Sequence, residues 1–290
     1  VGFPIYESFT PQSHFDLMLS DDNHLYFVFS DTRNFIDNDI YLQKYNNFQS
    51  VFSEPTLIID NFFIDDDIKY IMTTPDNGCL LTYDSGSAST GIRAYFSMVD
   101  SDGNVAPGFQ GGVRLCEDEN DQFIKGLVKT NSGYFVIWKD SRSGSSDIYG
   151  QMLDFNGNLV GDAIAIVTAP NDQQAPSITY NSQNNEIMVC WEDFRNGLEF
   201  NIYCASIDES TLAVNSDIGI CTYSGNQKTP DVFATLDGVY LFTWEDSRNS
   251  VTSNIYYQSM TNNIFDYAND GVVLCDADFN QFSPTIDIYD

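Results

Sequence analysis

Short apolar stretches separated by polar turns run through the whole chain, which has 290 residues. The stretch 186–191 is apolar after its first residue, and the stretch 254–258 mixes apolar with polar positions. Both have the length of β-strands, and no segment keeps the 3.6-residue apolar period of an amphipathic helix. Turns such as 154–158 contain a Gly, which supplies the positive φ of a tight hairpin. The pattern predicts an all-β chain with almost no helix.

One motif recurs along the chain and organises these strands. Trp-x-Asp-x-Arg is followed, after a short loop, by a strand that reads Ile-Tyr. The copies begin at Trp244, Trp191 and Trp138, at Phe29 in a copy without Trp, and at Thr82 in a copy that is nearly erased. Copies at a spacing of roughly fifty residues indicate a repeat protein.

Each unit carries four strand signals, and the first strand follows Gln-x-x-Pro in the clearest copies. Four short strands per unit with a repeated Trp favour a β-propeller over a β-sandwich. Units that begin near residues 12, 62, 122, 173 and 227 predict five four-stranded antiparallel blades in a single domain over 1–290. Residues 1–6 and 284–289 have the phase of strands that close the ring. The alternative is a slice of a longer repeat array, because the same terminal pieces fit a sixth blade.

Units that combine Trp-x-Asp-x-Arg, Asp-Ile-Tyr-x-Gln and Asn-Gln-x-x-Pro resemble the propeller repeats of secreted and cell-surface bacterial proteins. Such repeats occur in large exported proteins of Bacteroidetes-like bacteria. The resemblance covers essentially the whole chain and is weakest in the second unit, which lacks the Trp, the Arg and Gln-x-x-Pro. It implies an extracellular or cell-surface location and does not imply a ligand.

Acidic residues outnumber basic ones by 42 to 12, which gives a net charge of −30 at pH 7. Such a surface repels nucleic acid, because binding it requires Lys and Arg to neutralise phosphates. Anionic membranes are disfavoured for the same reason, and no apolar run approaches the roughly 20 residues that span a bilayer. Solubility explains the charge, and weak calcium binding by clustered carboxylates is the alternative. No other cofactor is expected.

Three acidic segments are the candidates for calcium, namely 65–67, 100–103 and 117–121. The segment 100–103 places its Gly fourth, whereas an EF-hand loop needs Gly at its sixth position, so a hairpin turn explains it better. Solvated loop charge explains the other two. The identity of any metal ligand stays unknown.

The six cysteines fit no metal-binding spacing. Cys190 and Cys204 bracket one predicted hairpin and would face each other if Trp191 pairs with Tyr203. A disulfide between them is an open alternative to two buried thiols, because cross-strand bridges are geometrically demanding.

The repeated Asp and Arg invite a catalytic interpretation, as a set of acids around a central pore. Catalysis needs one asymmetric constellation, however, and this pair occurs in almost every unit. We therefore interpret each pair as structural, with the carboxylate accepting backbone N–H bonds and the guanidinium bridging to the next blade. The pairs are Asp31 with Arg33, Asp140 with Arg142, Asp193 with Arg195, and Asp246 with Arg248.

Signals for an enzyme are weak at this level. A glycosidase needs two carboxyl groups about 5–9.5 Å apart, but carboxylates are so frequent here that their presence decides nothing. A sialidase-like site needs an Arg cluster, and only Arg93 and Arg114 lie outside the repeated motif. We therefore expect the chain not to be an enzyme.

Large aromatic residues in loops are the candidate ligand-binding residues, because exposed aromatic clusters mark contact surfaces. The expected function is a non-catalytic extracellular binding or scaffold module that mediates contact with another protein chain or adhesion. A lectin-like propeller that binds a surface glycan is the alternative, and a glycosidase or sialidase-like enzyme is a distant one. The candidate residues are Phe35, Phe194, Phe200, Phe62, Phe63, Tyr223 and Phe279.

Overall fold

Strands make up the regular secondary structure of the residues that the structure describes. The computed structural model describes residues 11–46, 49–51, 54–61, 64–87, 89–248, 252–268 and 270–287. Within these ranges no helix is long and apolar enough to cross a membrane. The predicted all-β class is confirmed.

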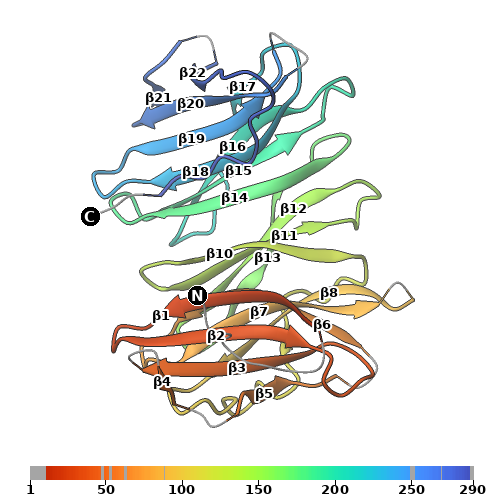
Figure 1. Ribbon diagram of the computed structural model, residues 1–290. Helices are drawn as coiled ribbons and strands as arrows, with labels where there is room; N and C mark the ends of the chain where they lie inside the picture. Colours follow the sequence, from red (N-terminus) through yellow and green to blue (C-terminus); the bar gives the residue numbers. More distant parts are fainter. Residues whose placement is uncertain are drawn as a thin grey trace. The chain divides into compact units, whose positions relative to one another are not determined.

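The described strands form five sheets of four or five strands, in which the first four strands of each sheet pair in chain order (Figure 1). The first sheet contains β1 (Gln12–Leu19), β2 (His24–Asp31), β3 (Asp39–Asn46), β4 (Gln49–Ser50) and β5 (Thr56–Ile59). The second contains β6 (Asp65–Thr73), β7 (Cys79–Ser87), β8 (Gly91–Val99) and β9 (Val113–Arg114). The third contains β10 (Gln122–Lys129), β11 (Gly133–Asp140), β12 (Asp147–Asp154) and β13 (Leu159–Val167).

The fourth sheet contains β14 (Gln173–Asn181), β15 (Glu186–Asp193), β16 (Asn201–Asp208) and β17 (Ile218–Cys221). The fifth contains β18 (Gln227–Ala234), β19 (Tyr240–Asp246), β20 (Asn254–Thr261), β21 (Ile264–Phe265) and β22 (Val272–Cys275). Extra outer strands complete the first and fifth sheets, because β5 pairs with β3 and β22 pairs with β20. The prediction of five blades, one sheet to each repeat unit, is confirmed.

The chain groups into two compact units. Unit 1 is Val1–Ile124 with Leu153–Leu159, and unit 2 is Lys125–Met152 with Val160–Asp290. Residues 1–6, predicted to form a terminal strand, lie outside the described residues. Residues 284–287 are described and are not in a strand, although the Ile286 N–H donates to Asp231 Oδ2 at 2.8 Å.

The second strand of each sheet carries most of the core. In β15 every residue after Glu186 is buried, and the side chains of Trp191 and Cys190 have no exposed surface. A short apolar run without alternation is typical of such a doubly covered strand. The outer strand β13 is exposed over its first half and pairs with a neighbour along one edge only. Burial therefore falls from the second strand towards the outer strand of the sheet.

The Gln-x-x-Pro motif forms a β-bulge on the first strand. The register of β18 on β19 shifts between Lys228 and Asp231, and β14 has the same shift on β15. Thr229, the residue before the Pro, has a φ of 50°, which disrupts the ladder and leaves its N–H without a strand partner. Glu192 Oε1 accepts that N–H at 2.8 Å. The middle residue of Trp-Glu-Asp thus joins the fourth sheet to the bulge of the fifth.

In the second sheet the structure shifts the predicted alignment of the repeat by one residue. Tyr83 pairs with Tyr95, and the two rings stack with centroids 5.5 Å apart. Trp191 pairs with Tyr203 in the same way in the fourth sheet. Tyr83, and not Thr82, therefore occupies the position of the repeated Trp.

Candidate functional site

The Asp-x-Arg motif closes a compact set of hydrogen bonds in the fifth sheet. Asp246 Oδ2 accepts the indole N–H of Trp244 at 2.8 Å, and Asp246 Oδ1 accepts the backbone N–H of Arg248 at 2.8 Å. The guanidinium of Arg248 donates to Asp246 Oδ2 at 2.7 Å and lies 4.1 Å above the ring of Tyr256. The Arg248 side chain is only 6% exposed. Both carboxylate oxygens are thus engaged inside the hairpin, which supports a structural role.

The other copies repeat this arrangement within their own sheets. Arg142 and Arg195 bind Asp140 and Asp193 at 2.6 Å and are about a quarter exposed. In unit 1, Arg33 binds Asp31 at 2.9 Å and lies 3.7 Å from the ring of Tyr41. The expected bridge to the next blade is wrong in direction for the fifth sheet: Arg248 Nη2 contacts Cys221 Sγ, on β17 of the preceding sheet, at 3.0 Å.

The candidate aromatic residues do not form one described cluster. Phe194 and Phe200 lie together in the β15–β16 loop, with ring centroids 4.8 Å apart. Tyr223 lies beneath the guanidinium of Arg248, at 4.8 Å. Phe35 in unit 1 and Phe279 in unit 2 are more than four-fifths exposed. Phe62 and Phe63 lie outside the described residues. The ligand-binding role of the aromatic residues stays a prediction.

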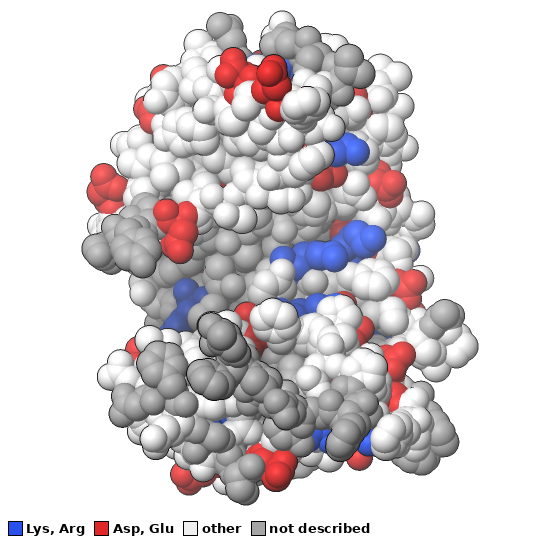
Figure 2. All heavy atoms as spheres, in the orientation of Figure 1, with Lys and Arg blue, Asp and Glu red and all other residues white. Residues whose placement is uncertain are grey.

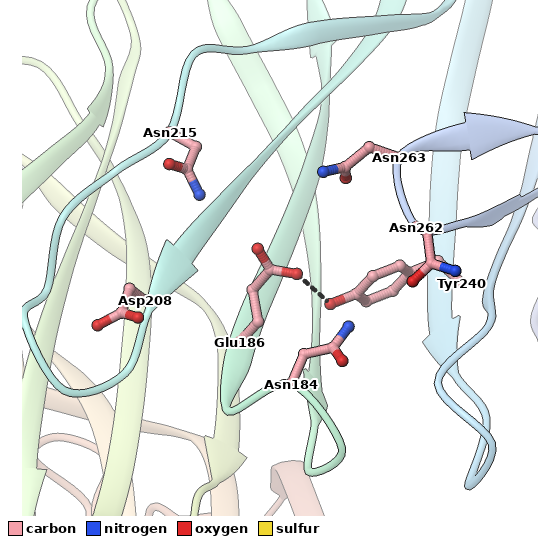
Figure 3. A pocket seen from close by; sticks show the side chains of 7 residues that line it. All are labelled: Asn184, Glu186, Asp208, Asn215, Tyr240, Asn262 and Asn263. Atoms are coloured by element: carbon pink, nitrogen blue, oxygen red, sulfur yellow. Dashed lines mark hydrogen bonds between the residues drawn. The ribbon is translucent and has the colours of Figure 1, made fainter.

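A polar pocket of about 450 Å³ lies within unit 2, between the fourth and fifth sheets (Figure 3). It is found at the strand ends opposite to the Asp-x-Arg motif, because Glu186 begins β15 and Asp193 ends it. Two carboxylates, four amides and one phenol line it. The lining residues are Asn184, Glu186, Asp208, Asn215, Tyr240, Asn262 and Asn263.

Glu186 is held in this pocket by Tyr240. The phenol donates to Glu186 Oε2 at 2.8 Å, and the other oxygen of Glu186 points towards the space between Asn215 and Asn263 (Figure 3). Burial, reinforced by the adjacent carboxylate, raises the pKa of Tyr240 well above its usual value of 10. Tyr240 therefore stays protonated and acts as a fixed hydrogen-bond donor.

Asp208 is the second carboxylate of the pocket and lies directly opposite Glu186 at the end of the β15–β16 ladder. Its Oδ1 accepts hydrogen bonds from Ser210 Oγ at 2.7 Å and from Thr211 N at 2.8 Å. These hydrogen bonds lower the pKa of Asp208. Asp208 is therefore ionised at neutral pH.

Sequence reasoning missed all the residues that line the pocket. The signal was present in the Asn-rich turns at 181–185 and 262–263. Asn185, Asn262 and Asn263 have positive φ, a conformation that Asn tolerates in tight turns. Turn chemistry alone therefore explains these residues at the sequence level, and only the packing of two sheets shows that the turns share a cavity.

Unit 1 contains buried carboxylates with strongly perturbed titration. Burial, followed by repulsion from Asp60 and Asp37, raises the pKa of Asp39 to about 7. Burial also raises the pKa of Asp66 to about 6. Both side chains are almost fully buried, and neither lines the described pocket. Their raised pKa values make the stability of unit 1 dependent on pH.

Of the acidic segments proposed for calcium, 100–103 is engaged with its own turn, whereas 65–67 begins β6 and Asp66 is fully buried, so the prediction of solvated loop charge is wrong there. Asp100 Oδ1 accepts the N–H groups of Asp102 and Asn104, as expected for a hairpin turn. Glu119 pairs with Arg114 at 2.9 Å. In the described part of the chain no three His, Cys, Asp or Glu side chains are grouped to hold a metal ion. Figure 2 shows acidic side chains scattered over the visible face.

No model of a protein family matches this chain, and no curated protein matches it. The resemblance to secreted bacterial repeats and the extracellular location therefore stay predictions. Solved structures do match. An α-L-arabinanase from Penicillium chrysogenum, in complex with arabinobiose, has a TM-score of 0.58 at 12% identity over 94% of this chain and 84% of the arabinanase.

Two sialidases match with a TM-score of 0.53 at 8% identity over 91% of this chain. One is the NanB sialidase from Streptococcus pneumoniae, of which 62% is covered, and the other is the Hadza microbial sialidase Hz136, of which 58% is covered. These likenesses show the fold, which is that of a five-bladed β-propeller.

The comparisons correct the expectation of a non-catalytic scaffold. The solved structures that share this fold include an arabinanase and sialidases, which are enzymes that act on carbohydrate. The expectation rested on a motif that recurs in almost every unit, and that repetition describes only the frame of the sheets. Residues at the strand ends vary freely on that frame and can build one asymmetric site.

Proposed function

We propose that this chain is a glycoside hydrolase that binds a neutral sugar in the pocket of unit 2. The observation that carries the proposal is the carboxylate of Glu186, held by Tyr240 in a pocket lined by four Asn side chains. Its fold, shared with an arabinanase, supports the same class of function.

The lining suits a sugar because each amide offers both a donor and an acceptor to neighbouring hydroxyl groups. None of the lining residues is Lys or Arg, so the carboxylate of a sialic acid would meet Glu186 and Asp208 without a cationic partner. Repulsion between like charges disfavours such a ligand. A neutral glycan, such as an arabino-oligosaccharide, is therefore the favoured substrate class.

Glu186 and Asp208 supply the two carboxyl groups that glycoside hydrolysis requires. Directly opposed residues of an antiparallel pair have Cα atoms about 4.5–5.5 Å apart, and two side chains that start from such a pair can reach the 5–9.5 Å separation of glycosidase carboxylates. Ionised Asp208 suits the role of nucleophile or base. Glu186, held by Tyr240 with its other oxygen directed into the pocket, is the second carboxyl group at the scissile bond.

The test is turnover of neutral oligosaccharides, with arabinobiose and longer arabino-oligosaccharides as the first probes and sialyllactose as the charged comparison. Release of reducing ends should occur with a neutral glycan and fall by at least about a hundredfold in Glu186→Gln and Asp208→Asn. Asp154→Asn is the matched control, because Asp154 caps the β12–β13 turn through Asn156 and Asn158 and does not line the pocket. Unchanged turnover in Glu186→Gln would contradict the assignment.

A lectin is the second candidate, and the amide-rich lining favours it, since amides bind hydroxyl groups without performing chemistry. Titration calorimetry with the same neutral glycans distinguishes the two. Saturable binding that is lost in Asn215→Ala, with no product formed after prolonged incubation, would replace hydrolysis with binding alone.

A further inference from the structure

Two cysteines face each other inside the core of unit 2. Cys190 on β15 is the direct register partner of Cys204 on β16, and neither thiol has exposed surface. Both belong to the same core cluster, together with Trp244. In the structure both thiols are free.

The hydrogen-bonding phase of the ladder determines how close the Cα atoms of the two cysteines lie. The N–H of Glu209 donates to the carbonyl of Asn185, so 185 and 209 form a hydrogen-bonded pair. Such pairs alternate along an antiparallel ladder, which makes Cys190 and Cys204 a non-hydrogen-bonded pair. Cα atoms of these pairs lie about 4.5 Å apart, at the short end of the range of about 4.4–6.8 Å that a disulfide spans.

We propose that Cys190 and Cys204 form a cross-strand disulfide when the chain folds with a small-molecule disulfide present. Burial raises the pKa of both thiols in the folded state, so neither supplies much reactive thiolate once the sheet has closed. The bond therefore forms during folding, before the two strands are covered. After folding, the same burial shields it from reductants.

The oxidant of the proposed step is a disulfide such as oxidised glutathione. The thiolate of one cysteine attacks it, forms a mixed disulfide and releases one glutathione thiol. The second thiolate attacks the protein sulfur of the mixed disulfide and releases the second glutathione. The protein loses two hydrogens and two electrons, and one molecule of glutathione disulfide is reduced to two thiols.

The experiment compares the full chain refolded from denaturant with reduced glutathione alone and with a reduced–oxidised glutathione mixture. After free thiols are alkylated, peptide mapping should find Cys190 linked to Cys204 only in the second sample. The linked chain should show an unfolding equilibrium constant lower by roughly a hundredfold, as for a closed loop of about 15 residues. Cys190→Ala and Cys204→Ala should each abolish both effects.

Cys79→Ala is the matched control, because Cys79 is equally buried and lies in unit 1. This variant should keep the link and the gain in stability. Recovery of Cys190 and Cys204 as alkylated thiols after oxidative refolding would overturn the proposal, as would links that mainly join other cysteines. The outcome is independent of glycan hydrolysis, which involves neither thiol.

Discussion

Asn226 Oδ1 accepts the backbone N–H of Phe200 at 3.0 Å, which joins the first strand of the fifth sheet to the loop before the third strand of the fourth. The residue that precedes the repeated Gln position does the same in the second, third and fourth sheets and before Gln281, whereas Pro11 precedes Gln12 in the first sheet. A short side chain with an acceptor oxygen is needed for this bond, which explains why each of these five residues is Asp or Asn. The equivalent bonds link Asp65 to Asn38, Asp121 to Ile92, Asp172 to Ser146 and Asn280 to Ser253, at 2.9–3.1 Å.

Asn226→Ala should therefore lower the free energy of unfolding of unit 2 by about 1 kcal/mol, because the Phe200 N–H loses its acceptor. Asn226→Asp keeps the oxygen, as three other sheets do, and should cost much less. All three Trp residues lie in unit 2, so urea denaturation followed by Trp fluorescence measures the right transition. Equal losses in both variants would show that the hydrogen bond does not contribute.

Arg248→Ala should destabilise unit 2 by about 3 kcal/mol, because it leaves the buried carboxylate of Asp246 without its cation. Arg142→Ala should cost less, since the Arg142 side chain is 23% exposed and water can replace part of the interaction. Thermal and urea denaturation measure both losses. A larger loss in Arg142→Ala would contradict the link between burial and stability.

Asp39→Asn should stabilise unit 1 near pH 7.5 by about 1 kcal/mol, allowing for solvent screening. The folded-state pKa of Asp39, about 7, exceeds the usual Asp value of 3.8, so at intermediate pH the folded chain holds a proton that the unfolded chain has released. Stability should therefore fall as the pH rises from about 4 to 7 in the parent chain. The stability of the Asp39→Asn variant should fall less over the same pH range.

Asn is a suitable replacement because Asn201 occupies the equivalent position in the fourth sheet. The measurement is the free energy of unfolding of unit 1 from pH 4 to 8, followed by hydrogen exchange of its strands. An unchanged pH profile would show that Asp39 is not the carboxyl group that holds the proton.

Tyr240→Phe should lower kcat for the neutral glycan by about tenfold with little change in KM, because Glu186 loses the hydrogen bond that orients it. Tyr180→Phe is the matched control: Tyr180 donates to Glu209 Oε2 at 2.5 Å, outside the pocket lining. It should affect stability and leave kcat unchanged. Steady-state kinetics on the oligosaccharide that the parent chain hydrolyses checks both variants.

Much of the frame follows from local sequence. Trp-x-Asp-x-Arg and Gln-x-x-Pro specify strands and turns through contacts that lie mostly within one sheet or between successive sheets, such as Trp244 with Asp246. Local periodicity and turn chemistry therefore predict the strands and the number of sheets. The register of the second sheet was harder to predict, because Tyr83 replaces the Trp. Only the pairing of Tyr83 with Tyr95 shows that the repeat is shifted by one residue there.

The chain by itself determined an all-β propeller of five repeated sheets, because hydrophobic alternation and turn residues act over a few positions. Only the tertiary structure decided where chemistry can occur. Glu186 and Tyr240 are 54 residues apart and meet because β15 and β18–β19 belong to sheets that pack together. Nothing in the local pattern distinguishes an Asn that merely permits a turn from one that also lines a cavity, since both satisfy the same backbone geometry.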